Sequence, residues 1–278
     1  MALIQVDGNG TFVHVEDTGE GNGGGGKPVF FVHGWPLNHK MFEYQFMHLA
    51  QKGYRCIAID LRGFGMSAKP WGEYNYDVFA DDIQKVMNKL NLGQKFALVG
   101  FSMGGAIVMR YVAKYFPKDL SHVVLMGAAA PSFTKRQGYP YGHDRSFCDD
   151  LISKSLQGRP KMVSDFGKSF FSTPGSQGPE MDTWLFAQCM EASPHATLQC
   201  MVELRDADLR NDMQMLGERN LPAAIFHGTQ DKVCPFDFAK VMNEGIKGSK
   251  LVKFEKSGHG LNIEEKEKAN DELIKFIA

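Results

Sequence analysis

The sequence is short of cysteine, has no long apolar run and carries almost no excess charge of either sign. Its 278 residues include five cysteines, an odd number with no CxxC spacing, which argues against a zinc ribbon or a disulfide scaffold. No apolar stretch approaches the roughly 20 residues that a membrane-spanning helix needs, and the mean hydropathy is −0.27. We therefore expect reduced thiols and no membrane insertion.

The charge balance argues against another class of partner. The chain has 31 Lys and Arg residues against 32 Asp and Glu, a formal net charge of −1, which gives no electrostatic case for binding nucleic acid or an anionic membrane surface. The segment Met1–Asp7 lacks the basic start and apolar stretch of a secretory signal. Because 43% of the residues are hydrophobic, a sizeable core is available. These observations favour a globular protein of the cytoplasm.

Short apolar runs that are typical of buried strands recur along most of the chain. They are Thr11–Glu16, Val29–His33, Tyr54–Ile59, Phe96–Gly100, Val123–Gly127, Ala223–His227 and Leu251–Phe254. Most are continuously apolar rather than alternating, which suits strands buried on both faces of a parallel sheet. Leu3–Val6, joined to the first of these runs by Asp7-Gly8-Asn9-Gly10, predicts an N-terminal hairpin that feeds the sheet.

Helical patterns lie between the runs and predict βαβ units. The clearest are Tyr76–Leu90, Gly104–Tyr115 and Ile263–Ile277. Between about residues 130 and 221 only helical patterns occur, namely Phe147–Leu156, Lys161–Phe171, Met181–Glu191 and Thr197–Leu204. We therefore predict an α/β core made of residues 1–130 and 221–278, with a helical cap at 131–220. The glycine run at 21–26 predicts a flexible surface turn.

The stretch Gly100-Phe101-Ser102-Met103-Gly104 matches the GxSxG pattern of a nucleophile elbow. It follows the apolar run Phe96–Val99 and precedes a helical pattern, which is the strand–turn–helix context that the motif requires. Glycines are expected because the backbone of such a turn is strained, and side chains two residues away from the serine would collide with neighbouring chain. We therefore predict that Ser102 is a catalytic nucleophile.

A serine nucleophile needs a base that an acid holds in place, and with this elbow the three follow the chain order Ser, Asp or Glu, His. Asp231 follows one late strand-like run and His259 follows the next, so both are expected at the carboxyl edge of the sheet. Asp237 competes with Asp231, but it is expected to begin a helix. We predict Asp231 as the acid and His259 as the base, and we assign His227 to packing at a strand end.

Negative charge that develops during acyl transfer needs two backbone N–H donors. Met103, the residue after the nucleophile, supplies one of them. The other is expected in the loop His33-Gly34-Trp35-Pro36, which follows an early strand. Trp35 is the expected donor, because Pro36 has no N–H and confines Trp35 to extended geometry.

These motifs occur in one order along nearly the whole chain. They are His33-Gly34-Trp35-Pro36-Leu37, Asp60–Ser67, Gly100–Gly105, Asp206–Asp212, His227–Asp231 and Gly258-His259-Gly260. In these motifs the sequence resembles the α/β-hydrolase superfamily, and within it the cofactor-free haloperoxidase, arylesterase and perhydrolase group.

The resemblance implies an α/β-hydrolase fold: a mostly parallel eight-stranded sheet flanked by helices, with a helical cap insertion. It also implies a Ser102–His259–Asp231 triad and no metal or organic cofactor. Members of the group are commonly carboxylesterases that act on small acyl or aryl esters, and many form peracids from hydrogen peroxide. A proline after the oxyanion-loop tryptophan, here Pro36, is associated with that peracid chemistry in the family. Cys234 is a departure, because a valine is common at its position.

We therefore expect a serine hydrolase that cleaves small hydrophobic acyl or aryl esters through an acyl-enzyme, with a perhydrolase or haloperoxidase-like side activity. The predicted cap is rich in Phe and Met, which favours an apolar pocket, and the expected substrate-binding residues are Trp35, Phe101, Phe166 and Trp184. Lactonases and carbon–carbon bond hydrolases use the same triad, and so do some ligand sensors with slow turnover. The sequence leaves these alternatives open. It is also compatible with a lactone as the substrate and with a homo-oligomer.

Overall fold

The computed structural model describes residues 2–19 and 26–278 and contains one eight-stranded sheet. The strands are β1 (Ala2–Gln5), β2 (Phe12–Asp17), β3 (Pro28–Val32), β4 (Arg55–Ile59), β5 (Phe96–Phe101), β6 (Leu120–Met126), β7 (Ala223–Gly228) and β8 (Lys250–Phe254). Their order in the sheet is β1-β2-β4-β3-β5-β6-β7-β8. Strands β1 and β2 form the predicted antiparallel hairpin, and β2 also runs antiparallel to β4, whereas the remaining neighbours pair parallel. The predicted α/β class is therefore confirmed, while most of the glycine run at 21–26 lies outside the described residues.

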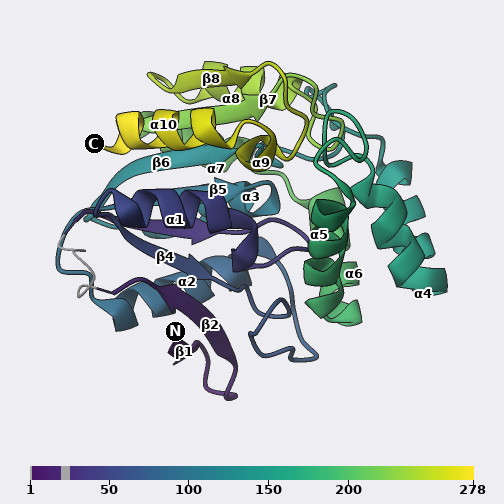
Figure 1. Ribbon diagram of the computed structural model, residues 1–278, viewed down its shortest axis with the longest axis horizontal. Helices are drawn as coiled ribbons and strands as arrows, with labels where there is room; N and C mark the ends of the chain where they lie inside the picture. Colours follow the sequence, from purple (N-terminus) through teal and green to yellow (C-terminus); the bar gives the residue numbers. More distant parts are fainter. Residues whose placement is uncertain (1, 20–25) are drawn as a thin grey trace.

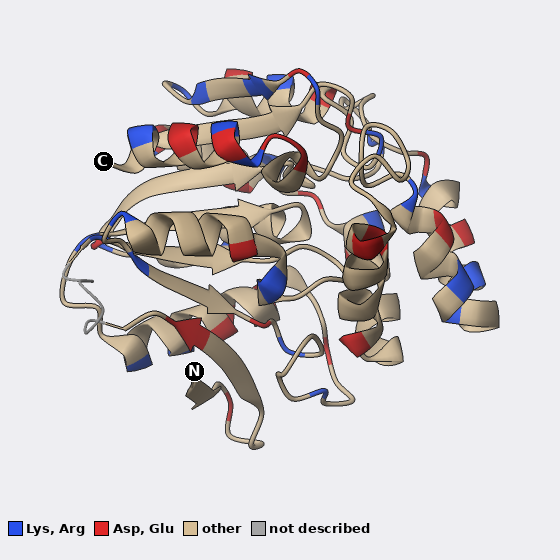
Figure 2. Ribbon diagram, in the orientation of Figure 1, with Lys and Arg blue, Asp and Glu red and all other residues tan. Residues whose placement is uncertain are grey.

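The central strands explain the continuous apolar runs of the sequence. Every residue of β3, β4 and β5 is buried. Strands β3 and β5 contain no charged residue. Figure 2 shows acidic and basic residues interspersed along the helices. A strand covered on both faces has no solvent side that would favour polar residues, so no alternation develops.

Helices cover both faces of the sheet (Figure 1). They are a short 3₁₀ helix (His39–Phe42), α1 (Glu43–Gln51), α2 (Tyr76–Leu90), α3 (Met103–Tyr115), α8 (Asp237–Gly245), α9 (Leu261–Glu264) and α10 (Lys266–Ile277). Helix α1 packs against α10, and α2 packs against α3. Asp237 begins α8, as expected from its position in the sequence. No helix in the described parts of the chain is long and apolar enough to cross a membrane.

Helices also fill the segment between β6 and β7. They are α4 (Arg145–Gly167), α5 (Pro179–Glu191), α6 (Pro194–Asp206) and α7 (Arg210–Glu218). Figure 1 shows α4, α5 and α6 gathered at one end of the sheet. The helical patterns predicted before and after Gly158 are confirmed as two helical segments, because the backbone of α4 leaves the helical conformation at Gly158 (φ −178°, ψ 74°) and kinks there. Helix α7 lies within the predicted cap range of 131–220, yet it packs against α3 of the core, where Arg110 Nε lies 3.3 Å from Asp212 Oδ1.

A buried carboxylate holds the loop that follows β4. The backbone N–H groups of His39 and Met66 donate hydrogen bonds to the two oxygens of Asp60, each at 2.8 Å. The His39 and His14 rings also lie against it, with Nδ1 at 2.7 and 3.2 Å. Burial alone would raise the pKa of the Asp60 carboxyl, but the hydrogen bonds of His14 and His39 outweigh it and hold the pKa far below its usual range.

Replacement of this carboxylate is expected to destabilise the fold. In Asp60→Asn, the new amide N–H₂ faces a backbone N–H donor, so we expect the free energy of unfolding to fall by about 3 kcal/mol in urea titrations. Since the folded-state pKa of Asp60 is lowered, the stabilisation is present above pH ~4 and is lost as the pH falls further. In the control Asp150→Asn, which removes an exposed pair with Lys154, a change within about 0.5 kcal/mol is expected. Equal losses in both variants would contradict this role of Asp60.

Candidate active site

Ser102 is the single residue between the end of β5 and the start of α3. Its φ of 54° and ψ of −119° place it in the strained, left-handed half of backbone space, and the residue is 6% exposed. Its N–H donates a 2.9 Å hydrogen bond to the Met126 carbonyl, and its own carbonyl accepts from Gly105 and Ala129, each at 2.9 Å. Neighbouring backbone therefore holds this turn from both sides.

Three glycines allow the chain to pass close to Ser102. A Cβ on Gly100 would lie 2.5 Å from the Gly104 carbonyl oxygen, and a Cβ on Gly104 would collide with the carbonyl oxygens of the chain leaving β3. The expected collisions two residues either side of the serine are therefore confirmed. A Cβ on Gly34 would lie only 2.8 Å from Ser102 Cβ, so the loop after β3 runs directly against the serine.

Asp231 and His259 meet although 28 positions separate them in the sequence. Asp231 lies in the loop after β7 and His259 in the loop after β8, and His259 Nδ1 is 2.8 Å from Asp231 Oδ2. The other carboxylate oxygen accepts hydrogen bonds from the N–H groups of Val233 and Cys234, each at 2.8 Å. With its oxygens so occupied, the carboxylate has a fixed orientation towards the imidazole.

A second imidazole also faces Asp231. His227 Nε2 donates to the Cys234 carbonyl at 2.8 Å and lies 3.4 Å from Asp231 Oδ2. Burial alone would raise the pKa of the Asp231 carboxyl, but its interactions with His259 and His227 outweigh burial and hold the pKa well below its usual range. Sequence reasoning missed this contact, although the four-residue separation across the turn after β7 was a signal for it.

The ring of His259 lies over the elbow. Its centroid is 4.8 Å from that of Phe101, the residue immediately before Ser102, and Phe170 of the cap meets it edge-on at 5.6 Å. Nδ1 is engaged by Asp231, and within residues 2–19 and 26–278 no group donates to or accepts from Nε2. The Ser102 hydroxyl likewise makes no hydrogen bond to that nitrogen in the described chain; catalytic hydrogen bonds often close only when substrate binds.

Cys234 lies against both the acid and the serine. Burial raises the pKa of its thiol well above the ordinary value, Asp231 raises it further, and hydrogen bonding with Ser102 offsets part of the rise. Cys234 is therefore a neutral thiol at physiological pH and not a competing nucleophile.

Two backbone N–H groups in segments next to Ser102 lack acceptors among the described residues. Met103 is the first residue of α3, where an N–H has no intrahelical acceptor. The Trp35 N–H donates no hydrogen bond within the described residues. The Trp35 side chain is anchored in the cap, since its Nε1 donates to the Thr197 carbonyl of α6 at 2.9 Å. Its ring also meets Phe166 of α4 edge-on, with centroids 5.4 Å apart.

A second link between the same loop and the cap is formed by Glu191, the last residue of α5. Its two carboxylate oxygens accept hydrogen bonds from Asn38 Nδ2 and Lys40 Nζ, each at 2.9 Å. The segment 35–40 is therefore attached to two cap helices.

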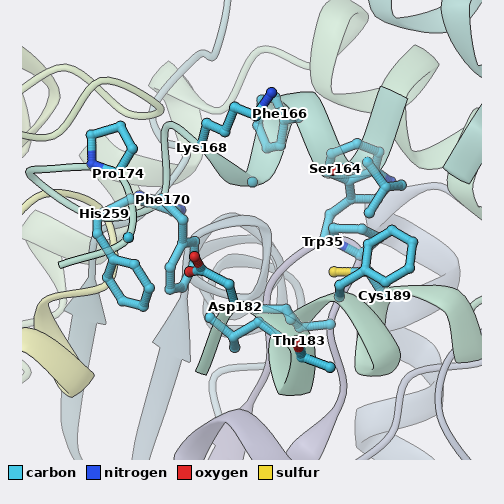
Figure 3. Close-up of a pocket in the computed structure, with 18 residues that line it drawn as sticks. Trp35, Ser164, Phe166, Lys168, Phe170, Pro174, Asp182, Thr183, Cys189 and His259 are labelled. Atoms are coloured by element: carbon cyan, nitrogen blue, oxygen red, sulfur yellow. The ribbon is translucent and has the colours of Figure 1, made fainter. Parts of the chain in front are cut away.

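A cavity of about 540 Å³ lies between the cap and the core (Figure 3). Its lining is mainly apolar and includes His259, Trp35, Leu37, Phe166, Phe170 and Phe171. Of the expected substrate-binding residues, Trp35 and Phe166 line the cavity, whereas Phe101 and Trp184 do not. Phe101 is 1% exposed and packs beneath His259 as the end of β5, and Trp184 is half-buried on α5.

The cavity also contains charged residues that sequence reasoning did not select. Lys168 follows the end of α4, and Asp182 lies in the first turn of α5. Their place depends on the angle at which α4 bends and on how α5 packs beside it. The sequence around Gly158 indicates a break but not that angle, and the packing of α5 has no local sequence signal.

Residues 27–266 match the family described as having the alpha/beta hydrolase fold. The chain is 47% identical over 262 residues to the AB hydrolase superfamily protein YisY of Bacillus subtilis, and the match covers 94% of each protein. It is 31% identical over 255 residues to the bifunctional esterase/perhydrolase DCH of Acinetobacter calcoaceticus, covering 90% of this chain and 91% of that protein.

Solved structures agree over the whole length. An esterase from Exiguobacterium antarcticum is 42% identical with a TM-score of 0.92, and the match covers 99% of this chain and 98% of that one. A bromoperoxidase from Bacillus anthracis is 33% identical, also with a TM-score of 0.92, and the match covers 99% of each chain.

Proposed function

The chain belongs to the α/β-hydrolase family, and from that premise we propose that it is a carboxylesterase-type serine hydrolase with Ser102, His259 and Asp231 as its triad. One observation carries the proposal: the loops that follow β5, β7 and β8 bring an elbow serine and a paired imidazole and carboxylate to the same edge of the sheet. In open α/β sheets this carboxyl edge is where ligands bind. The named relatives include esterases and a perhydrolase, which supports the same class of chemistry.

In the first step His259 Nε2 removes the proton of Ser102, and Ser102 Oγ attacks the acyl carbonyl carbon of the ester. The contact of Nδ1 with Asp231 sets the tautomer, because Nδ1–H donates to the carboxylate and leaves Nε2 as the base. The lowered pKa of Asp231 keeps the carboxylate charged, so it stabilises the imidazolium that forms.

The carbonyl oxygen becomes an oxyanion as Oγ attacks, and the N–H groups of Trp35 and Met103 are the proposed donors to it. A preorganised donor of this kind contributes about 2.7–4 kcal/mol to the lowering of the barrier. The imidazolium of His259 then protonates the leaving alkoxide, and the alcohol departs from an acyl-enzyme at Ser102.

The acyl group leaves Ser102 by attack of a second small nucleophile. Water gives the free acid, and hydrogen peroxide gives the peracid, with His259 taking the attacking proton and returning it to Ser102 Oγ in either case. We propose the peracid route as a side activity, supported by the esterase/perhydrolase relative and by Pro36 at the cavity wall.

The cavity supports small hydrophobic acyl or aryl esters as the substrate class. Aromatic and aliphatic side chains form most of its wall, and its volume of about 540 Å³ suits a small molecule.

Covalent labelling tests the nucleophile. A fluorophosphonate probe is expected to add one adduct per chain to the wild-type protein and none to Ser102→Ala, as measured by intact mass spectrometry. A panel of phenyl and alkyl esters, lactones and dienone acids then identifies the bond that is cleaved. An unlabelled wild-type protein that still binds ligand would favour a sensor, and labelling of the Ala variant would refute Ser102 as the nucleophile.

A further inference from the structure

Asp182 is an acidic residue in an otherwise mainly apolar cavity. It lies in the first turn of α5 and lines the cavity together with His259. Figure 3 shows its carboxylate turned towards the side of the cavity where Phe170 and His259 lie. Asp182 Oδ2 would lie 3.9 Å from a Cβ on Gly175, so the facing turn, which also lines the cavity, runs close to the carboxylate.

The carboxylate of Asp182 has no cationic partner among the described residues. Its backbone N–H donates to the Gly178 carbonyl at 3.2 Å, but its side chain takes part in no hydrogen bond or ion pair there. Lys168 also lines the cavity, yet its ammonium group is bound to Asp165 at 2.9 Å. Asp182 is therefore the unpaired fixed charge of the described cavity wall.

Aromatic rings form part of the wall of the cavity that contains this charge. Trp35, Phe166 and Phe170 line the same cavity, and the faces of such rings attract cations. A quaternary ammonium suits such a wall because it needs no hydrogen-bond acceptors when it leaves water. A carboxylate combined with aromatic walls favours a positively charged group and repels a negatively charged one.

We propose that Asp182 makes the cavity selective for esters that carry a quaternary ammonium group over neutral esters of the same shape. The proposal rests on the esterase function proposed above and specifies its substrate class. Because Asp182 is exposed, solvent and salt screen its charge, and the selectivity due to Asp182 is about threefold to tenfold at low ionic strength.

Acetylcholine and 3,3-dimethylbutyl acetate form a suitable test pair, because the second compound has a neutral carbon where acetylcholine has its quaternary nitrogen. The measured quantity is the ratio of their kcat/KM values in wild type and in Asp182→Asn, so that the difference in intrinsic reactivity of the two esters cancels. The matched control is Glu180→Gln, which removes an acidic residue of the same helix turn that does not line the cavity.

We expect the ratio to fall at least threefold in Asp182→Asn and to stay constant in Glu180→Gln. The wild-type ratio is expected to decline as salt is raised from 10 mM to 1 M, while that of Asp182→Asn stays level. Turnover of both esters with an equal ratio in wild type and Asp182→Asn would overturn the inference. A parallel fall in Glu180→Gln would also overturn it, since net charge alone would then explain the effect.

Calorimetric binding separates this inference from the function on which it rests. If wild type hydrolyses neither these two esters nor any ester of the panel above, the esterase proposal fails. The affinities of both esters for Ser102→Ala and for the double variant with Asp182→Asn still decide the role of Asp182. Weaker binding of acetylcholine alone in the double variant supports the inference, and equal binding in the two proteins refutes it.

Discussion

Ser102→Ala is expected to lower kcat/KM for p-nitrophenyl acetate by roughly 10⁴- to 10⁶-fold, the largest effect of any single substitution in this protein. Without Oγ no acyl-enzyme forms, and attack by water must proceed with only the oxyanion donors and the bound geometry to assist it. Steady-state hydrolysis measured with purified protein, against a buffer blank, gives the value.

The fold is expected to survive this change. The serine side chain makes no hydrogen bond to the β-sheet, and alanine accepts the backbone at φ 54° no worse than serine does. The free energy of unfolding should therefore stay within about 1 kcal/mol of wild type. A variant that unfolds like wild type yet keeps its esterase rate would remove Ser102 from the mechanism.

Asp231→Asn is expected to lower kcat/KM by about 10⁴-fold. The asparagine amide can turn its N–H₂ towards His259 Nδ1, which shifts the ring proton to Nε2 and abolishes the base that Ser102 needs. Because the pKa of Asp231 is lowered, the wild-type carboxylate stays charged at neutral and mildly acidic pH. Wild type therefore loses the stabilisation of the His259 imidazolium by this charge only at a pH below the normal Asp range.

The matched control for this variant is Asp237→Asn. Asp237 competes with Asp231 in the sequence, but the structure places it at the start of α8 in an exposed pair with Lys240. We expect Asp237→Asn to keep its activity within about twofold. If the two variants changed places, the acid of the triad would have been assigned to the wrong loop.

Much of the fold and the position of the site could be predicted because both are encoded locally. Continuous apolar runs predict buried strands, and parallel strands bring their carboxyl ends to one edge, so residues that follow them converge there. Ser102, Asp231 and His259 each follow such a run directly. Their roles remain proposals, whereas the structure shows that Asp231 and His259 meet.

The cap was less predictable because its arrangement depends on tertiary packing. The Gly158-Arg159-Pro160 segment predicts a break, and the backbone is indeed non-helical at Gly158, but the direction in which the two halves of α4 pack is not encoded there. Trp184 was expected at the substrate on composition alone, but it does not line the cavity. Asp182 has no sequence motif, and its place in the wall of the cavity that His259 also lines depends on the packing of α5 against α4.

The attachment of segment 35–40 to α5 and α6 has a consequence for how such enzymes diversify. The Trp35 indole and the Glu191 contacts attach the loop that bears the proposed oxyanion donor to α6 and α5. A displacement of α5 or α6 therefore also displaces segment 35–40, next to the proposed nucleophile. Substitutions in these helices that admit a larger substrate are therefore expected to change turnover and substrate selectivity together, unless the contacts of Thr197 and Glu191 are preserved.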